Sequence, residues 1–139
     1  MAVILYDPEE NLGGIVHAML PCPKGMVSSP MKYVDMGVCT LIDEMILSGA
    51  DQKRLVAALI GGGTIFNFGG ELAIGKKNVE AAKSVLRLKC IPIVVEETGG
   101  RRGRSVVFDA SSGEAFVAVS NPPLLVGYEL LGEVKGSTR

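Results

Sequence analysis

Apolar and polar positions divide the first twenty residues into two apolar runs separated by one polar run. The apolar run from Ala2 to Tyr6 predicts a short buried strand, and Gly13 to Leu20 predicts a second strand. Between them, Asp7-Pro8 and the polar residues as far as Asn11 predict a turn. Two strands joined by about six turn residues form an antiparallel hairpin with a long loop, so the sequence predicts a β-hairpin at the start of the chain.

Apolar residues spaced three and four apart predict two helices. Ser28-Ser29-Pro30 introduces the first helix, and Gly49 is its predicted end. The second helix is predicted over Asn78 to Leu88, whereas Arg54 to Ile60 fits either a strand or the end of a helix. The residues predicted to face inward are Val34, Val38, Leu41, Ile42 and Met45 in the first helix and Val79, Ala82, Val85 and Leu86 in the second.

The remaining segments are predicted to be extended. Thr64 to Phe68 and the β-branched run Ile91 to Glu97 are predicted strands, and residues from Asn121 onward form a tail with no assigned element. Arg104 to Asp109 and Glu114 to Val119 are predicted to form a hairpin. Strands and helices do not alternate strictly, so we expect an α+β fold with mixed sheets flanked by helices, in a single domain over residues 1–139.

Composition excludes several classes of protein. Hydrophobic residues make up 47% of the 139 residues and charged residues 21%, which excludes a disordered chain. A net charge of −1 argues against a nucleic-acid partner, because nucleic-acid-binding domains are usually basic. No unbroken apolar stretch is longer than Leu55 to Ile60, far below the roughly 20 residues that a membrane span needs, so we expect no membrane insertion.

The cysteines predict a reduced protein without a metal centre. Cys22, Cys39 and Cys90 are odd in number and widely spaced, so they offer neither a disulfide framework nor a metal-binding pair. A cytoplasmic location is the simplest interpretation. No residue pattern predicts a cofactor or a metal ion. Cys39 and Cys90 are interpreted as small buried hydrophobic residues.

His17 is the only histidine, and it lies within an apolar strand segment. A single histidine in a strand is more often structural than catalytic, but histidine is also the side chain best suited to acid–base work near neutral pH. If the protein activates a nucleophile, His17 is therefore the leading candidate base. Cys22 is a poor partner because five extended residues span about 16 Å and place it on the opposite side of the strand.

Two glycine-rich segments have alternative interpretations. Gly70 to Lys76 matches most of a phosphate-binding loop, but Lys77 stands where a hydroxyl should bind Mg²⁺, so nucleotide binding is the weaker hypothesis. Gly99 to Arg104 contains three arginines. This segment fits a solvated loop between strands, or a patch that docks an acidic partner surface.

Several short blocks, in order, resemble the CheD family, the chemoreceptor glutamine deamidases. Asp7-Pro8 followed by Leu12 to Pro21 resembles the family's first block, and Met31 to Asp35 resembles the next. The blocks cover nearly the whole chain, and together they are specific. The remaining blocks are Gly61-Gly62-Gly63, Ile74 to Asn78, Thr98 to Arg104, Phe108-Asp109 and Ser112 to Glu114.

The resemblance implies a cysteine-hydrolase-like fold and hydrolysis of glutamine side-chain amides on methyl-accepting chemotaxis receptors. It implies covalent catalysis by a cysteine thiolate, with a histidine as base and backbone N–H groups at the oxyanion. His17 occupies the family's histidine position, and the Gly61–Gly63 loop is a candidate for close approach to substrate. The implied partners are the receptors and CheC, a phosphatase that acts on the phosphorylated response regulator. A chemotaxis adaptor that binds CheC without catalysis is the alternative.

The resemblance places the nucleophilic cysteine one position ahead of Met1, and an assisting polar residue further upstream. If the hairpin is centred near Glu9-Glu10, Ala2 lies opposite His17, and a residue directly ahead of Met1 is a diagonal neighbour on the same face. Such neighbours are about 7–8 Å apart, within reach of a histidine side chain. The chain as given is therefore expected to lack the family's N-terminal segment and to be inactive. A start codon assigned too late, a trimmed chain and a natural loss of the nucleophile are the three explanations.

Overall fold

A computed structural model describes residues 1–27, 29–63, 74–120, 122–130 and 137–138. Within these residues the strands form two sheets of four, with orders β2-β1-β3-β4 and β5-β6-β7-β8. In the first sheet only the β3–β4 pair is parallel, so that sheet is mixed. The elements are β1 (Ala2–Asp7), β2 (Leu12–His17), η1 (Pro30–Lys32), α1 (Val34–Leu47), η2 (Gln52–Arg54), β3 (Val56–Gly61), α2 (Ile74–Leu88), β4 (Ile93–Thr98), β5 (Arg104–Asp109), β6 (Glu114–Val119), β7 (Leu124–Glu129) and β8 (Ser137–Thr138).

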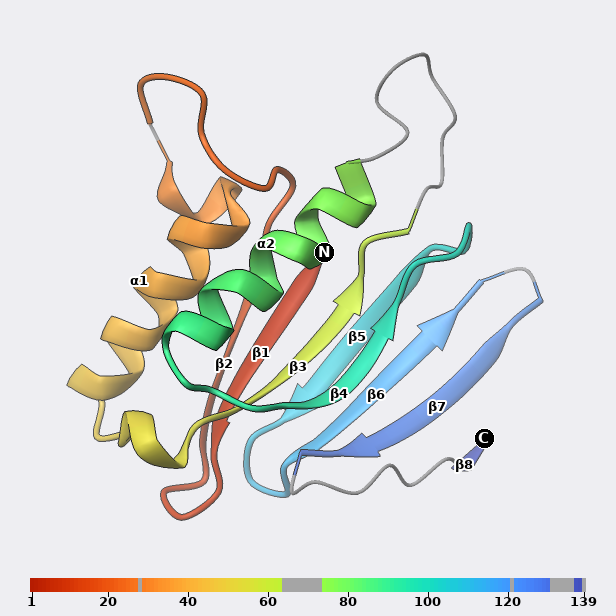
Figure 1. Ribbon diagram of the computed structural model, residues 1–139. Coiled ribbons are helices and arrows are strands. Elements are labelled where there is room, and N and C mark those ends of the chain that lie inside the picture. Colours follow the sequence, from red (N-terminus) through yellow and green to blue (C-terminus); the bar gives the residue numbers. More distant parts are fainter. Residues whose placement is uncertain (28, 64–73, 121, 131–136, 139) are drawn as a thin grey trace.

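The first sheet lies between the two helices and the second sheet (Figure 1). Alternate residues of β1 point to opposite faces, so this buried strand contributes to two cores. Val3 and Leu5 pack with the inward residues of α1 and α2. Ile4 and Tyr6 pack against the second sheet. The predicted α+β class, with a mixed sheet flanked by helices, is confirmed.

The inner core, which lies between the two helices and the first sheet, confirms the predicted helix faces. All nine residues predicted to face inward in the two helices are buried. Gly49 follows α1 with a φ of +112°, as expected for the residue that ends a helix. Helix α2 begins at Ile74, four residues before the predicted start at Asn78.

The second core joins the two sheets. Tyr6 of β1 and Phe108 of β5 meet edge to face, with ring centroids 5.5 Å apart. Such a pair contributes about 0.5–1.5 kcal/mol beyond burial. Gly13, opposite Tyr6 on β2, leaves the space that the Phe108 ring fills. The hairpin and the second sheet are therefore fixed relative to each other by close packing.

Further sequence predictions differ from the structure. Strand β2 ends at His17 rather than Leu20, because the N–H groups of Met19 and Leu20 both donate to the Lys32 carbonyl. Strand β4 starts at Ile93 rather than Ile91. The tail with no assigned element contains β7 and β8, which complete the second sheet. Arg54 to Ile60, which fitted either a strand or the end of a helix, contains the last residue of η2 and most of β3. The predicted strand Thr64 to Phe68 lies outside the described residues.

Cys90 also differs from the prediction, because it is exposed rather than buried. Its φ is +57°, and the Ile91 N–H donates to the Leu86 carbonyl across it. This bond is the long one of a Schellman motif, in which the residue after the helix adopts a left-handed conformation. Cys90 thus ends α2 and its side chain points away from the core. Cys39 is partly buried and packs against the inner core, as predicted.

Candidate active site

The hairpin places His17 at the open end of the first sheet. Ala2 pairs with His17 across β1 and β2, which confirms the register expected from the sequence. The Met1 amino group donates to the Ala18 carbonyl, and the Ala18 N–H donates to the Met1 carbonyl, each at 2.9 Å. The ladder therefore continues one pair beyond β1, and a residue added ahead of Met1 in the same strand would lie opposite Met19.

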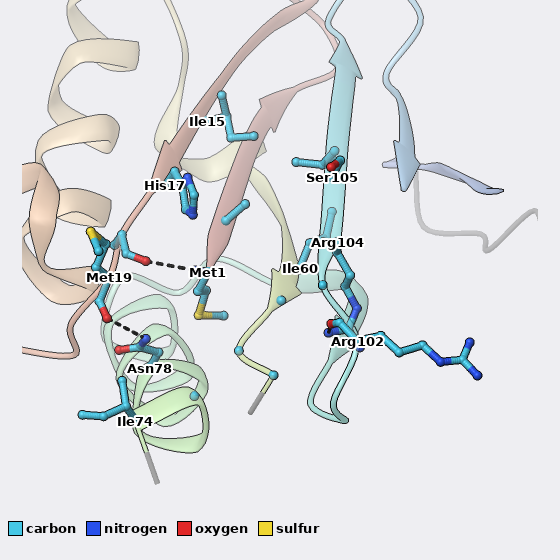
Figure 2. Close-up of a pocket in the computed structure, with 18 residues that line it drawn as sticks. Met1, Ile15, His17, Met19, Ile60, Ile74, Asn78, Arg102, Arg104 and Ser105 are labelled. Atoms are coloured by element: carbon cyan, nitrogen blue, oxygen red, sulfur yellow. Dashed lines mark hydrogen bonds between the residues drawn. The ribbon is translucent and has the colours of Figure 1, made fainter. Parts of the chain in front are cut away.

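A pocket of about 790 Å³ opens beside these residues. His17 lines it together with Met1 and the glycine loop Gly61–Gly63, and the start of α2 and residues 102–106 complete the wall (Figure 2). The His17 side chain is exposed, and no described residue forms a hydrogen bond or an ion pair with its ring. The imidazole is therefore available to exchange a proton with a group in the pocket.

The amino terminus adds a second polar group to the pocket. Burial lowers the pKa of the Met1 amino group below its usual 8.0, because the charged form loses water. In Figure 2, Met1 lies between His17 and Asn78. Chain added ahead of Met1 would convert this amine to a peptide group at the wall of the pocket.

The glycine loop Gly61–Gly63 is held between the start of α2 and the loop that precedes β5. A Cβ at Gly62 would lie 3.0 Å from the Gly75 carbonyl oxygen, and Gly62 has a φ of +65°. A Cβ at Gly63 would lie 3.1 Å from the Gly99 carbonyl oxygen. The loop therefore requires glycine both for its conformation and for its close contacts. The structure brings this predicted loop to the same pocket as His17.

Arg104 is the arginine of the glycine-rich segment that turns inward. Its Nε lies 2.6 Å from Glu97 Oε2, and both side chains are largely shielded from solvent. Neither Arg104 Nε nor Glu97 Oε2 has a hydrogen-bond partner of good angle, so charge attraction is the main part of their contact. Arg101 and Arg102 are exposed, and Arg102 lines the pocket. In this segment, Arg104 thus forms an ion pair with Glu97, and the exposed Arg102 adds positive charge to the rim of the pocket.

Asn78 lines the same pocket, although from the sequence it was predicted only to start a helix and to close the Ile74–Asn78 block, and not to be a site residue. It is only 4% exposed. Its Nδ2 donates to the Met19 carbonyl at 3.2 Å, whereas its Oδ1 is buried without a donor among the described residues. Its spacing could have indicated that Asn78 is buried, since it lies one turn before Ala82 on the inward face of α2.

Comparison with known proteins identifies the family. The family model described as CheD chemotactic sensory transduction matches residues 19–119. The chain belongs to the CheD family. A protein of Thermococcus kodakarensis named probable chemoreceptor glutamine deamidase CheD is 43% identical over 118 residues, which are 82% of this chain and 73% of that protein. A protein of the same name from Desulforamulus reducens is 38% identical over 131 residues, covering 91% and 79% of the two chains.

The cysteines of this CheD chain lie away from the pocket. Cys22 is exposed and is not among the residues that line it. Cys39 belongs to α1, and Cys90 follows the far end of α2. The pocket therefore contains the candidate base, His17, but none of the three cysteines in the sequence.

Other kinds of site have little support in the described part of the CheD chain. No group of three or more His, Cys, Asp and Glu side chains there could hold a metal ion. Of the weaker phosphate-loop match Gly70–Lys76, residues 70–73 lie outside the described residues, and Gly75 and Lys76 belong to the first turn of α2. No described helix has the length and apolar character needed to cross a bilayer.

Proposed function

We propose that this is a chemotaxis protein whose pocket beside His17 is built to hydrolyse glutamine side-chain amides of chemoreceptors, with a cysteine directly ahead of Met1 as the nucleophile. The observation that supports this most directly is the hairpin register. Ala2 lies opposite His17, so a side chain one residue ahead of Met1 shares the His17 face as a diagonal neighbour, about 7–8 Å away between backbones. A cysteine at that position is within reach of the imidazole. The names of the relatives support the choice of chemoreceptor glutamine as substrate.

The proposed reaction proceeds through a thioester. His17 accepts the thiol proton, and the thiolate attacks the side-chain carbonyl carbon of glutamine. The C–N bond then breaks, and the proton passes from His17 to the leaving nitrogen, which departs as ammonia. Water, deprotonated by His17, attacks the thioester carbonyl, which releases glutamate and restores the thiol. Main-chain N–H groups of the Gly61–Gly63 loop are the proposed donors to the oxyanion.

Adding a cysteine ahead of Met1 tests this proposal. The extension should end in Gly-Ser-Cys and carry several upstream residues, since the resemblance also places an assisting polar group there. The extended protein should release ammonia from a cognate receptor fragment, and the unextended chain should release none. His17→Ala should reduce the rate by about 10²–10⁴-fold, the usual contribution of a general base. An extension ending in serine is the matched control, with the same length and no thiol.

Two results would contradict the proposal. One is a folded, extended protein that releases no ammonia from any cognate receptor fragment. The other is an extended His17→Ala protein that retains full activity. The proposed reaction needs a reduced thiol as nucleophile, so we also propose a cytoplasmic location, and all three cysteines in the structure are free.

A second proposed function is binding of the CheC phosphatase, which the family resemblance implies. The observation that favours a protein partner is the exposure of apolar side chains beside His17. Ile15 is 45% exposed and Met19 is 66% exposed, and both line the pocket. Binding of CheC by the unextended chain, measured by calorimetry and weakened by Met19→Asp, would support this role. Unchanged affinity in Met19→Asp would exclude this surface.

A further inference from the structure

The mouth of the pocket carries basic side chains that no acidic side chain of the described chain neutralises. Five basic residues lie on the segments that form its wall or adjoin it, and all five are exposed. None of them forms an ion pair with another described residue. These cations can therefore attract charge from outside this chain. They are Lys32, Lys76, Lys77, Arg101 and Arg102.

The two arginines lie on a turn that is attached to the glycine loop. The Gly99 N–H donates to the Gly61 carbonyl at 3.0 Å, which ties the turn between β4 and β5 to the end of β3. Arg102 lines the pocket, and in Figure 2 its guanidinium points away from His17. Arg102 is thus placed to meet groups that lie beside a bound glutamine side chain, rather than the glutamine side chain itself.

The three lysines adjoin the wall of the pocket from two other elements. Lys76 and Lys77 belong to the first turn of α2 and directly follow Gly75, which lines the pocket. The Lys32 carbonyl accepts the Met19 N–H at 2.9 Å, so η1 lies beside another lining residue. Segments far apart in the sequence therefore bring positive charge to the same opening.

Fewer carboxylates lie near this opening. Glu97 is paired with Arg104 at 2.6 Å, so these two charges largely cancel. Asp35 accepts a main-chain N–H at the start of α1, and Glu80 is exposed one turn after Lys76. Two carboxylates without an ion pair thus stand against five such cations, and no acidic residue is among the described residues that line the pocket.

We propose that this mouth binds an acidic protein segment, so that the preferred substrate glutamine has aspartate or glutamate residues beside it. The inference rests on the proposed function, because it names the substrate class of the same site. Ile15 and Met19 are exposed in the same wall, which suits a protein segment with apolar as well as acidic side chains. The net charge of −1 opposes binding to an extended polyanion such as a nucleic acid or an anionic membrane.

Binding of two peptides to the unextended protein tests this inference without any chemistry. The peptides have equal length and one central glutamine, which is flanked on both sides by glutamate in one peptide and by serine in the other. Amide NMR titration should show about tenfold tighter binding of the acidic peptide, since several exposed ion pairs add small contributions. Raising the salt concentration from about 0.1 M to about 1 M shortens the screening length from about 10 Å to about 3 Å, so most of this preference should disappear.

Paired substitutions locate the charges that carry the preference. Arg101→Gln combined with Arg102→Gln should weaken binding of the acidic peptide about fivefold and leave the serine peptide unchanged. Lys76→Gln combined with Lys77→Gln should act in the same direction. Lys53→Gln combined with Arg87→Gln is the matched control, because it removes the same charge from exposed positions in η2 and in the last turn of α2. Thermal unfolding shows whether each variant keeps the fold.

Several results would overturn the inference. They are equal binding of the two peptides, no binding of either, a preference that persists at high salt, and an equal loss of affinity in the control variant. Tighter binding to phosphatidylglycerol vesicles, or to a DNA oligonucleotide of the same charge as the acidic peptide, would assign the basic mouth to a different partner and contradict it too.

The extended protein separates this inference from the proposed function. If it releases ammonia from both peptides at equal rates, the proposed function stands and the inference is wrong. If it releases none from any cognate receptor fragment although the unextended chain prefers the acidic peptide, the proposed function is wrong and the acidic docking surface stands. Faster release of ammonia from the acidic peptide, reduced in Arg101→Gln combined with Arg102→Gln, is the result expected when both hold.

Discussion

Asp7 and Arg54 form a two-point ion pair at the closed end of the hairpin, opposite to the pocket. Arg54 Nη2 lies 2.9 Å from Asp7 Oδ2, and Arg54 Nε lies 3.0 Å from Asp7 Oδ1. Asp7 is fully buried, and it also accepts N–H bonds from Glu9 and Asp51. The pair therefore joins the β1–β2 turn to the segment that leads into β3, and so helps to fix the hairpin register on which the site depends.

The Asp7–Arg54 pair makes the free energy of unfolding depend on pH under acidic conditions. The hydrogen bonds from Arg54 hold the pKa of Asp7 at about 2, below its usual 3.8, although burial opposes them. Because the folded pKa is the lower one, the stabilisation is complete above the usual pKa and is lost as the pH falls toward 2. Asp7→Asn should lower the free energy of unfolding at pH 7 by roughly 1–2 kcal/mol, after allowance for screening at the partly exposed Arg54.

Urea unfolding at pH 7 and at pH 3 measures this effect. The wild-type protein should lose stability between the two pH values, and Asp7→Asn should lose less. Asp43→Asn, at an exposed position of α1, is the control and should follow the wild-type pH dependence. Equal pH dependence in wild type and Asp7→Asn would show that the pair does not contribute.

Gly75 is predicted to control the shape of the glycine loop. A Cβ there would lie 2.9 Å from the Gly63 carbonyl oxygen and 2.8 Å from the Gly62 carbonyl carbon, both backbone atoms. Gly75→Ala should therefore displace Gly61–Gly63 and destabilise the protein by about 1–3 kcal/mol, as overpacking usually does. Gly25→Ala is the matched control, because a Cβ at Gly25 has no atom within 4 Å and should leave stability almost unchanged.

Thermal unfolding and the amide NMR signals of Gly62 and Gly63 report the two effects separately. A Gly75→Ala protein with wild-type stability and unshifted loop signals would contradict the close contact described here. Loop displacement without loss of stability would show that α2 can move to accept the methyl group.

The sequence predicted local structure well, because local structure depends on short-range patterns. The β1–β2 register follows from strand parity and the position of the turn, so the pairing of Ala2 with His17 could be inferred from the sequence alone. The inward face of α1 follows from the spacing of its apolar residues. The C-terminal strands were missed because β7 is half exposed and its apolar run contains Gly127, which weakens a strand pattern.

The pocket could be predicted only in part. His17 and the Gly61–Gly63 loop were inferred from residue type and family resemblance, and the structure places both at one pocket. Asn78 was missed as a site residue because its partner, Met19, is 59 residues away, and no local pattern shows that the start of α2 lies beside the residues that follow β2. The inward turn of Arg104 likewise depends on Glu97 in β4, a strand of the other sheet.

Nucleotide binding at Gly70–Lys76 is predicted to be absent. A phosphate-binding loop places a hydroxyl after its lysine to bind Mg²⁺, whereas this sequence has Lys77 at that position. Calorimetric titration of ATP or GTP with Mg²⁺ should show no binding at millimolar concentrations. Micromolar affinity that disappears in Lys76→Ala would reverse this prediction, and Lys83→Ala, in the same helix, would serve as the control for a general loss of positive charge.

The last prediction concerns the acidity of a thiol added ahead of Met1, and it needs no receptor. Because Met1 continues the β1–β2 ladder through Ala18, a cysteine directly ahead of it lies diagonally to His17 on the same face of the sheet. A neighbouring imidazole lowers a thiol pKa below its free value of about 8.5, since the imidazolium stabilises the thiolate. In the extended protein, the rate of alkylation by iodoacetamide should therefore titrate below pH 8. His17→Ala should return the midpoint to about 8.5.

Cys22 provides the internal control for this measurement. It is exposed and lies outside the pocket, so its alkylation midpoint should not respond to His17→Ala, and Cys22→Ala should not change the reactivity of the added cysteine. Mass spectrometry of the alkylated peptides distinguishes the two thiols in one sample. If the added cysteine titrates like Cys22 in the wild-type background, the strand does not continue in register beyond Met1. If its midpoint is low but does not change in His17→Ala, another group activates the thiol, and the role of base proposed for His17 is wrong.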